Sequence, residues 1–373
     1  MDKKYSVGMI GVGRMGSNHA RGYVMNPFTN LVAGADTDPE LLELFQERFG
    51  AEGYQTWDEM FEDKQIDIAG PVLSFSVYGA AGVVAARAGG ISIFCEKPLT
   101  ASLADADRMV EECASRGIVF AAGLVPRNYP EMWQAREMIE SGEVGAVQSI
   151  NVYEKLSQGG CHGINMARHF AGDVEADWVV GWTGGDPHGE TEEEFGAIGG
   201  YVRFENGVET FVHWTEDNPL AGASKVQVIC EKAVFYRDDG GMHMLRKSDA
   251  GVVEEVKGVF PTRSKERYYD ADGWNDVSFG LHASIQTIVE TLNTGEKLRA
   301  TTGNDLRKSL EIVIAMRESA RRGHIPVKLP IEDRSLTMRP MLRRWTFKVT
   351  TMGREAYMRD MAAHRGEPGT RRS

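Results

Sequence analysis

A chain of 373 residues is long enough for two domains, each with a substantial hydrophobic core. Hydrophobic residues make up 42% of the chain and charged residues 26%, which is typical of a soluble globular protein. The net charge of −12 argues against nucleic acid as a partner. No apolar run approaches the ~20 residues that a membrane-spanning helix needs, so we expect no membrane partner.

The ends and the cysteines of the chain are consistent with this class. Residues 1–4 lead into an apolar stretch without the layout of a signal peptide, so we expect a cytoplasmic protein. The four cysteines form neither a CxxC pair nor a metal-ligand spacing, so we expect free thiols and no metal site. They are Cys95, Cys113, Cys161 and Cys230.

A glycine-rich turn follows the first apolar run, residues 7–10. Its first glycine permits a tight turn out of a strand, the second allows backbone to approach a pyrophosphate, and the third lets the next helix pack closely. The helix expected at 15–23 directs its unpaired N–H groups at the phosphates. We therefore predict cofactor contacts from six residues: Gly11, Val12, Gly13, Arg14, Met15 and Gly16.

Asp36 comes twenty residues after Gly16, at the end of a second strand predicted over 31–35. A carboxylate at this place accepts hydrogen bonds from the ribose hydroxyls of NAD and repels the 2′-phosphate of NADP. Asp38 adds a second negative charge, although it also fits as the cap of a helix over 39–49. The pattern predicts NAD rather than NADP.

The remainder of the first ~125 residues alternates strands and helices, which indicates a doubly wound parallel sheet of the Rossmann type. A helix over 127–142 follows. The pattern then predicts a mainly antiparallel open sheet and two further helices, an α+β domain whose Asn206-Gly207 pair marks a hairpin. The strands are expected at 65–76, 91–95 and 118–124, then at 147–156, 178–183, 194–205, 208–216, 226–231, 233–237 and 242–246, and the helices at 80–88, 103–115, 279–291 and 305–321.

We therefore expect a cofactor-binding domain over 1–125, a substrate-binding and oligomerisation domain over 126–339, and a C-terminal extension over 340–373. The extension has eight lysines and arginines against three acidic residues, a net charge of +5 that leaves −17 on the rest. A basic extension on an acidic body is expected to dock on its own subunit or on a neighbour. Its last eight residues, 366–373, are expected to be disordered.

Two segments carry chemistry. Lys97, within Glu96-Lys97-Pro98, follows the strand at 91–95 and can stabilise a developing alkoxide beside the nicotinamide; away from a cofactor it would be an ordinary surface charge. His162 follows a double glycine and opens a helical pattern over 164–170. The helix dipole favours its neutral form, a competent general base, although a histidine at a helix start can equally cap or pack. His169, on the same helix, is expected to pack or face solvent.

These landmarks together resemble the Gfo/Idh/MocA family of sugar oxidoreductases, the glucose–fructose oxidoreductase and inositol dehydrogenase type, from about residue 5 to 330. The resemblance implies that Lys97 is the catalytic lysine and that His162 exchanges the hydroxyl proton. It also implies NAD contacts from Ser74, Glu96, Lys97 and Arg127, and dimers or tetramers formed through the C-terminal sheet.

The chain departs from the family pattern next to the histidine. Gln158 stands where an aspartate is usual, and Asn165 replaces a second one. We keep Gln158 among the catalytic residues because its amide can hydrogen-bond a sugar hydroxyl or His162, but it cannot share a proton. Glu154 is a candidate to supply the missing carboxylate.

The function expected is NAD-dependent hydride transfer from a sugar, cyclitol or glycoside hydroxyl, with Lys97 and His162 handling the proton. Two alternatives stay open. One is an NAD-dependent glycosidase or lyase that oxidises transiently, eliminates a substituent and recycles the hydride. The other is a non-catalytic NAD-binding regulator.

Overall fold

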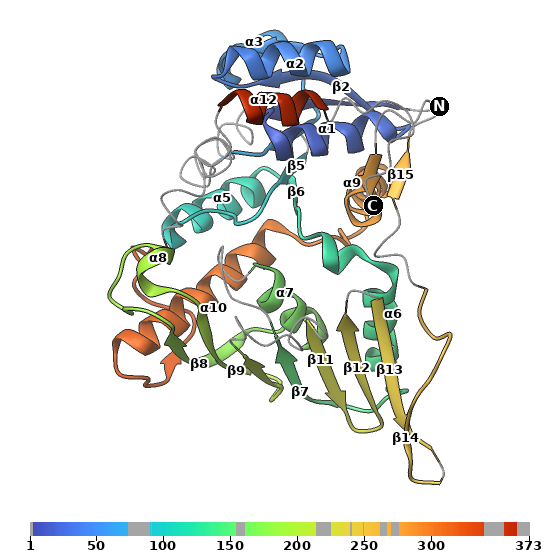
Figure 1. Cartoon of the computed structure of the whole chain (residues 1–373), viewed down its shortest axis with the longest axis vertical. Helices are drawn as coiled ribbons and strands as arrows, with labels where there is room; N and C mark the ends of the chain where they lie inside the picture. The colour runs from blue at the N-terminus through green and yellow to red at the C-terminus, as the bar shows by residue number, and fades with distance from the viewer. Residues whose placement is uncertain are drawn as a thin grey trace.

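The computed structural model describes residues 3–73, 90, 92–153, 161–213, 225–238, 241–248, 250–261, 267–269, 276–338 and 354–363. A parallel sheet with its helices forms one end of the molecule, and a second, larger sheet forms the other (Figure 1). Helices α7 (Cys161–Phe170) and α10 (Gly303–Arg321) lie between the two sheets. The expected combination of an α/β and an α+β unit is confirmed.

The N-terminal sheet has six parallel strands in the order β3-β2-β1-β4-β5-β6. Its order reverses between β1 and β4, which places a ligand crevice at their carboxyl ends. The strands are β1 (Tyr5–Ile10), β2 (Thr29–Ala35), β3 (Glu52–Tyr54), β4 (Ile68–Pro71), β5 (Ser92–Cys95) and β6 (Val119–Ala122), and the helices α1 (Arg14–Met25), α2 (Pro39–Phe49), α3 (Trp57–Asp63) and α5 (Leu103–Ser115).

Two local predictions were wrong or incomplete, and a third is not tested. The short edge strand β3 and helix α3 were missed, although Thr56 and Glu59 form a capping box at the start of α3. The single helix expected over 127–142 is a 3-10 turn, η1 (Val125–Asn128), followed by α6 (Pro130–Glu140), because Pro130 fits the first turn of a new helix. The helix expected over 80–88 lies outside the described residues.

The strand predicted over 194–205 begins with a short helix, α8 (Glu192–Phe195), before the strand itself. Thr191 and Glu194 form a capping box there, and this local pairing starts a helical turn. The predicted hairpin at Asn206-Gly207 is confirmed, since Gly207 has a φ of 89° and joins two antiparallel strands.

The second sheet has nine strands in the order β14-β13-β12-β11-β7-β10-β9-β8-β17. All its neighbours run antiparallel except β7 and β10, which are parallel. The strands are β7 (Val147–Val152), β8 (Ala176–Thr183), β9 (Ile198–Phe204), β10 (Glu209–Val212), β11 (Val226–Cys230), β12 (Ala233–Asp238), β13 (Gly241–Lys247), β14 (Val253–Glu255) and β17 (Val327–Lys328). A separate pair consists of β15 (Arg267–Tyr269) and β16 (Asp276–Ser278).

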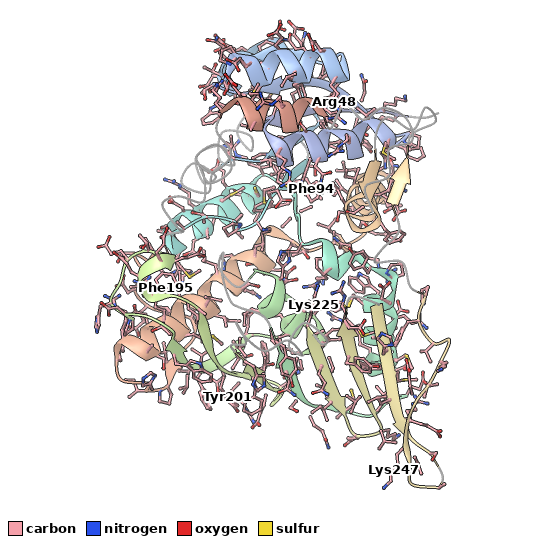
Figure 2. The ribbon with its side chains drawn as sticks, in the orientation of Figure 1. Arg48, Phe94, Phe195, Tyr201, Lys225 and Lys247 are labelled. Carbon is pink, nitrogen blue, oxygen red and sulfur yellow. The ribbon has the colours of Figure 1, made fainter. Side chains whose placement is uncertain are left out.

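Among the described residues, helices cover one face of the nine-stranded sheet, and the other face carries partly exposed side chains. Helices α10, α7 and α6 contact one face, where alternate residues such as Val202 and Phe204 are buried. The opposite face carries a row of aromatic side chains, and Figure 2 shows Tyr201 on this side, away from α7 and α10. Period-two alternation in β8, β9 and β10 produces this division.

Two C-terminal helices return to the N-terminal unit. Helix α9 (Phe279–Thr294) packs Leu281, Ile285 and Ile288 into the same hydrophobic cluster as Tyr23 and Phe94. Helix α12 (Arg354–Ala363) lies across the N-terminal helices (Figure 1). Segments that come after residue 125 in the chain thus complete the N-terminal core. The domain boundaries expected at residues 125 and 339 stay predictions.

Within the ranges that the structure describes, no helix combines the length and the apolar character needed to cross a membrane.

Candidate functional site

The glycine turn has the geometry that a pyrophosphate cradle requires. Gly11 has a φ of 88°, and a Cβ there would lie 2.4 Å from the carbonyl oxygen of Val72. A Cβ on Gly16 would lie 2.0 Å from the carbonyl oxygen of Gly11, so only glycine lets α1 start this close to the sheet. These are the tight turn and the close packing predicted for the two positions.

The start of α1 is open to a ligand. Gly13 is its N-cap residue and provides no side chain, and the helix begins with Arg14 and Met15, which are both exposed. Met15 has 44% of its surface exposed, an unusual place for an apolar side chain. The first N–H groups of α1 therefore have no side-chain cap among the described residues, which fits an anionic group at this helix end.

Asp36 directly follows β2 and is tied to the glycine turn. Its Oδ2 accepts a hydrogen bond of 2.9 Å from the Val12 N–H, and its Oδ1 one of 3.1 Å from the Asp38 N–H. Burial raises the pKa of Asp36 above its ordinary value. Asp38 caps α2 by accepting from the Glu40 N–H, as expected. The carboxylate thus stands where the ribose of a dinucleotide would lie.

The basic C-terminal extension docks at this same corner. Arg354 of α12 contacts both Asp38 oxygens at 3.0 Å and Glu40 at 3.2 Å. The hydrogen bonds from Arg354 lower the pKa of Asp38. The expected docking on the chain's own body is confirmed for α12, but nothing in the sequence pattern identified Arg354 as the contact. It lies 316 residues from Asp38.

Glu96 follows β5 and is buried beside Lys97. His19 of α1 donates a hydrogen bond of 2.9 Å from Nε2 to Glu96 Oε1, and the Lys97 N–H donates one of 3.0 Å to Oε2. Burial by itself would raise the pKa of Glu96, but the hydrogen bond from His19 and the charge of Lys97 leave it below its ordinary value. Sequence reasoning missed His19, whose only signal was its place three residues after Gly16 on the buried face of α1.

His162 lies in the first turn of α7 and is partly buried. Burial and the nearby positive charge of Lys97 lower its pKa to about 4. The lowered pKa agrees with the predicted neutral imidazole, and its largest causes are burial and the charge of Lys97. The fold has brought Lys97 and His162 close enough for one charge to act on the other.

Two further cations act on the same imidazole. The charges of Lys225 and Arg237 also lower the pKa of His162, while Glu96 opposes them. Figure 2 shows Lys225 beside α7, at the end of β11 that faces the N-terminal unit. Arg237 pairs across the sheet with Val226, so the two cations lie on neighbouring strands. Sequence reasoning had assigned neither residue to the site.

The remaining predicted residues lie elsewhere or outside the described ranges. Arg127 of η1 directs Nη2 to Asp173 at 2.5 Å and lies 3.9 Å from Asp305, so its ion-pair partners among the described residues are carboxylates of the second unit. Its contact with the cofactor stays a prediction. Ser74 and Gln158 lie outside the described residues, as does Glu154.

His169, at the other end of α7, packs as expected. It is fully buried and its Nε2 lies 3.2 Å from the carbonyl oxygen of Met132. Burial and the charges of Arg127 and Arg136 hold its pKa well below the ordinary value. Since it belongs to the packed interior, it is not a candidate for the site.

Comparisons with known proteins identify relatives of this chain. Residues 5–124 match the model of an oxidoreductase family with an NAD-binding Rossmann fold. The chain is 24% identical to myo-inositol 2-dehydrogenase of Thermotoga maritima over 84% of its own length and 95% of that protein. It is 25% identical to the NAD-dependent scyllo-inositol 2-dehydrogenase of Bacillus subtilis over 89% and 98% of the two chains.

A solved structure shares the fold over nearly the whole length. A levoglucosan dehydrogenase in complex with NADH and levoglucosan superimposes with a TM-score of 0.71 at 19% identity, covering 88% of this chain and 100% of that one. At this identity the likeness concerns the fold. The glycine turn, Asp36 and Glu96-Lys97-Pro98 all lie within residues 5–124, the part of the chain that matches the Gfo/Idh/MocA oxidoreductase family with its NAD-binding Rossmann fold.

Proposed function

We propose that this protein is an NAD-dependent oxidoreductase that transfers a hydride from a CH–OH group of a sugar, cyclitol or glycoside. The observation that carries the proposal is the placement of Lys97, shortly after β5, and of His162, in the first turn of α7, with the charge of Lys97 acting on the imidazole. The two residues interact beside the carboxyl ends of a doubly wound sheet, where such folds bind their ligands. The names of the relatives, two inositol dehydrogenases and a levoglucosan dehydrogenase, support this substrate class.

The residues of the N-terminal unit fit NAD. The turn at Gly11–Gly16 and the open start of α1 would hold the pyrophosphate, and Asp36 would accept from the ribose hydroxyls. When bound, NAD supplies the hydride acceptor. Asp38 can stay negatively charged when NAD is bound, because Arg354 compensates its charge.

The chemistry of the hydroxyl belongs to Lys97 and His162. In the proposed reaction the C–H hydride leaves for the cofactor while the O–H proton passes to the imidazole of His162, so a carbonyl forms. The ammonium of Lys97 donates a hydrogen bond to the oxygen as negative charge develops on it. Both groups must contact the same hydroxyl for this reaction to proceed.

His19 and Glu96 have a positioning role in this scheme. Glu96 accepts from the backbone N–H of Lys97, and His19 fixes the carboxylate from α1. The His19 ring also packs on Phe94, with 4.9 Å between ring centroids. This buried contact ties the segment that carries Lys97 to the helix that begins at the glycine turn.

The test is a substrate panel. Purified protein and NAD are incubated with cyclitols, aldoses and glycosides, and NADH absorbance and products are followed together. We expect NADH to accumulate with at least one member and to be lost in Lys97→Ala, which still binds NADH in a fluorescence titration. Aglycone release without NADH accumulation would instead support the transient-oxidation alternative. NADH binding without conversion of any member would favour the regulator.

We also propose that the open face of the second sheet joins copies of this chain. Five side chains there form an uninterrupted row of ring contacts, and the face exposes Trp182 and Phe211 by 39% and 38%. The row consists of Trp178, Tyr201, Phe211, His213 and Tyr153. Light scattering of the intact protein and of Phe211→Glu tests this, and a monomeric wild type contradicts it.

A further inference from the structure

Arg237 is a buried cation at the edge of the candidate site. Only 7% of its surface is exposed, and it belongs to the face of the sheet that α6 and α7 cover. Its guanidinium carbon lies 5.5 Å from the centre of the Tyr129 ring. Its Nε–H is buried with no hydrogen-bond partner among the described residues. A buried donor of this kind is costly unless a ligand or water satisfies it.

Lys225 joins Arg237 on the adjacent strand. The Lys225 N–H donates a hydrogen bond of 2.7 Å to the Arg237 carbonyl oxygen, so the two residues stand side by side at one end of β11 and β12. Together with Lys97 they bring three positive charges within electrostatic reach of His162. Arginine and lysine at such close quarters are typical of carboxylate and phosphate recognition.

Two of the described carboxylates lie in the same region. Glu96 is held by His19 and by the Lys97 N–H, and its two oxygens are thereby engaged. Glu131 of α6 is fully buried near Tyr129, which also feels the charge of Arg237. Among the described charges that act most strongly on the pKa of His162, Glu96 raises it, and Lys97, Lys225 and Arg237 lower it.

We propose that the substrate is a sugar or cyclitol that carries an anionic group, either a carboxylate or a phosphate, bound by Arg237 and Lys225 while a hydroxyl lies between His162 and Lys97. This inference rests on the oxidoreductase function proposed above and narrows its substrate class. The planar guanidinium would donate to the anion, and the Arg237 Nε–H would gain an acceptor.

An anionic substrate would also favour the transfer of the hydroxyl proton to His162. In the free protein, burial and three cations hold the pKa of His162 near 4, which makes the imidazole a weak base at neutral pH. An anion seated between Arg237 and Lys225 adds a negative charge close to the imidazole and raises its pKa. The substrate would thus strengthen the base that removes its own proton, whereas a neutral sugar would leave the base weak.

The experiment compares matched compounds that differ only in charge. With NAD, initial rates are measured for D-glucose, D-glucuronate and D-glucose 6-phosphate, for the corresponding galactose series, and for myo-inositol and its monophosphate. We expect kcat/KM for an anionic member to exceed that of its neutral partner by about tenfold or more. We also expect the preference to weaken as salt is raised. Comparison of D-glucuronate with D-glucose 6-phosphate shows whether the site prefers a carboxylate or a phosphate.

Variants connect the preference to the residues. Arg237→Gln and, separately, Lys225→Gln should each lower the ratio of anionic to neutral kcat/KM by about tenfold, and Arg237→Lys should restore part of it. Arg246→Gln is the matched control. It removes an arginine from the opposite end of the same hairpin, where the guanidinium pairs with Glu143 at 2.7 Å. The control should keep the wild-type ratio.

Binding separates this inference from the oxidoreductase proposal. Calorimetric titration of the NADH complex with the same compounds reports recognition without turnover. Tighter binding of anionic members without any conversion would support anion recognition and contradict the reaction. Conversion of neutral members at equal or higher kcat/KM would overturn the anionic substrate while the reaction stands. Equal affinity for charged and neutral members in the complex would also overturn it.

Discussion

Both ends of α7 lie beside buried charged groups, but these groups have different roles at the two ends. At the C-terminal end, Arg127 and Arg136 converge on Asp173, and the Arg136 guanidinium also donates to the carbonyl oxygen of His169. At the N-terminal end, cations surround His162, whose Nδ1 is buried without a hydrogen-bond partner among the described residues. The ion pairs at the C-terminal end hold the fold, whereas the charges at the N-terminal end act on a titratable group that a ligand could contact.

The largest expected effect is on activity, at the N-terminal end. His162→Asn removes the base but keeps a polar side chain of similar size, so kcat should fall by about a thousandfold. NADH affinity should stay within about threefold of wild type, because the residue belongs to the second unit. Steady-state kinetics on the best substrate of the panel measures this. A variant with nearly full activity would remove His162 from the mechanism.

At the other end, the expected effect is on stability. Asp173→Asn removes the negative charge that pairs with Arg127 and Arg136, whose side chains are only 5% and 13% exposed. This loss should cost about 2–3 kcal/mol of unfolding free energy. Asparagine tolerates the positive φ of 59° at this position, so backbone strain should not contribute. Urea denaturation measures the loss, and kcat should change little.

Glu140→Gln is the control for Asp173. Glu140 pairs with the same Arg136 at 2.7 Å but is 57% exposed, so its loss should cost less than about 0.5 kcal/mol. Equal losses in the two variants would show that burial does not decide the contribution of these pairs.

A smaller effect is expected in the pH dependence of stability. His162 has a pKa of about 4 in the folded protein against about 6.5 in an unfolded chain, so the unfolded chain binds more protons between these values. Stability contributed by the neutral imidazole is therefore lost as the pH falls from about 6.5 to about 4. The unfolding free energy of His162→Asn should therefore change with pH less steeply than that of the wild type, by up to about 1.4 kcal/mol per pH unit between these values.

His243 provides a comparison of opposite sign. Burial alone would lower its pKa, but hydrogen bonds to Glu255 and Asp238 raise it above the ordinary value. The stabilisation from its charged form is complete at low pH and is lost as the pH rises through the raised pKa. His243→Gln should therefore lose stability at low pH, and parallel curves for both histidine variants would contradict these assignments.

The smallest expected effect concerns α12. Arg354 is half exposed, so Arg354→Ala should change global stability little. It should instead release α12 locally, which limited proteolysis can detect as faster cleavage near residue 354 at unchanged urea midpoint. Because Arg354 faces Asp38, NAD affinity is measured alongside. Unchanged cleavage would mean that apolar contacts, such as that of Met358 with the N-terminal core, hold the helix.

Local chemistry determined much of this protein from its sequence alone. The roles of Gly11 and Gly16, the position of Asp36 after β2, the cap at Asp38 and the hairpin at Asn206-Gly207 all follow from backbone sterics and short-range hydrogen bonds. The alternation of strands and helices predicted the parallel sheet, and the succession of strand-like segments with a hairpin turn predicted the antiparallel one. Such features depend on neighbours a few residues apart, which a sequence displays directly.

Only the tertiary structure decided what surrounds the reacting groups. His19 meets Glu96 across 77 residues, Arg354 meets Asp38 across 316, and Arg237 and Lys225 reach His162 from a sheet whose strand order is not the chain order. The cause of the low pKa of His162 likewise lies in burial and in charges from distant segments rather than in its own helix. Electrostatic and packing energies depend on distance in space, and chain separation does not encode that distance.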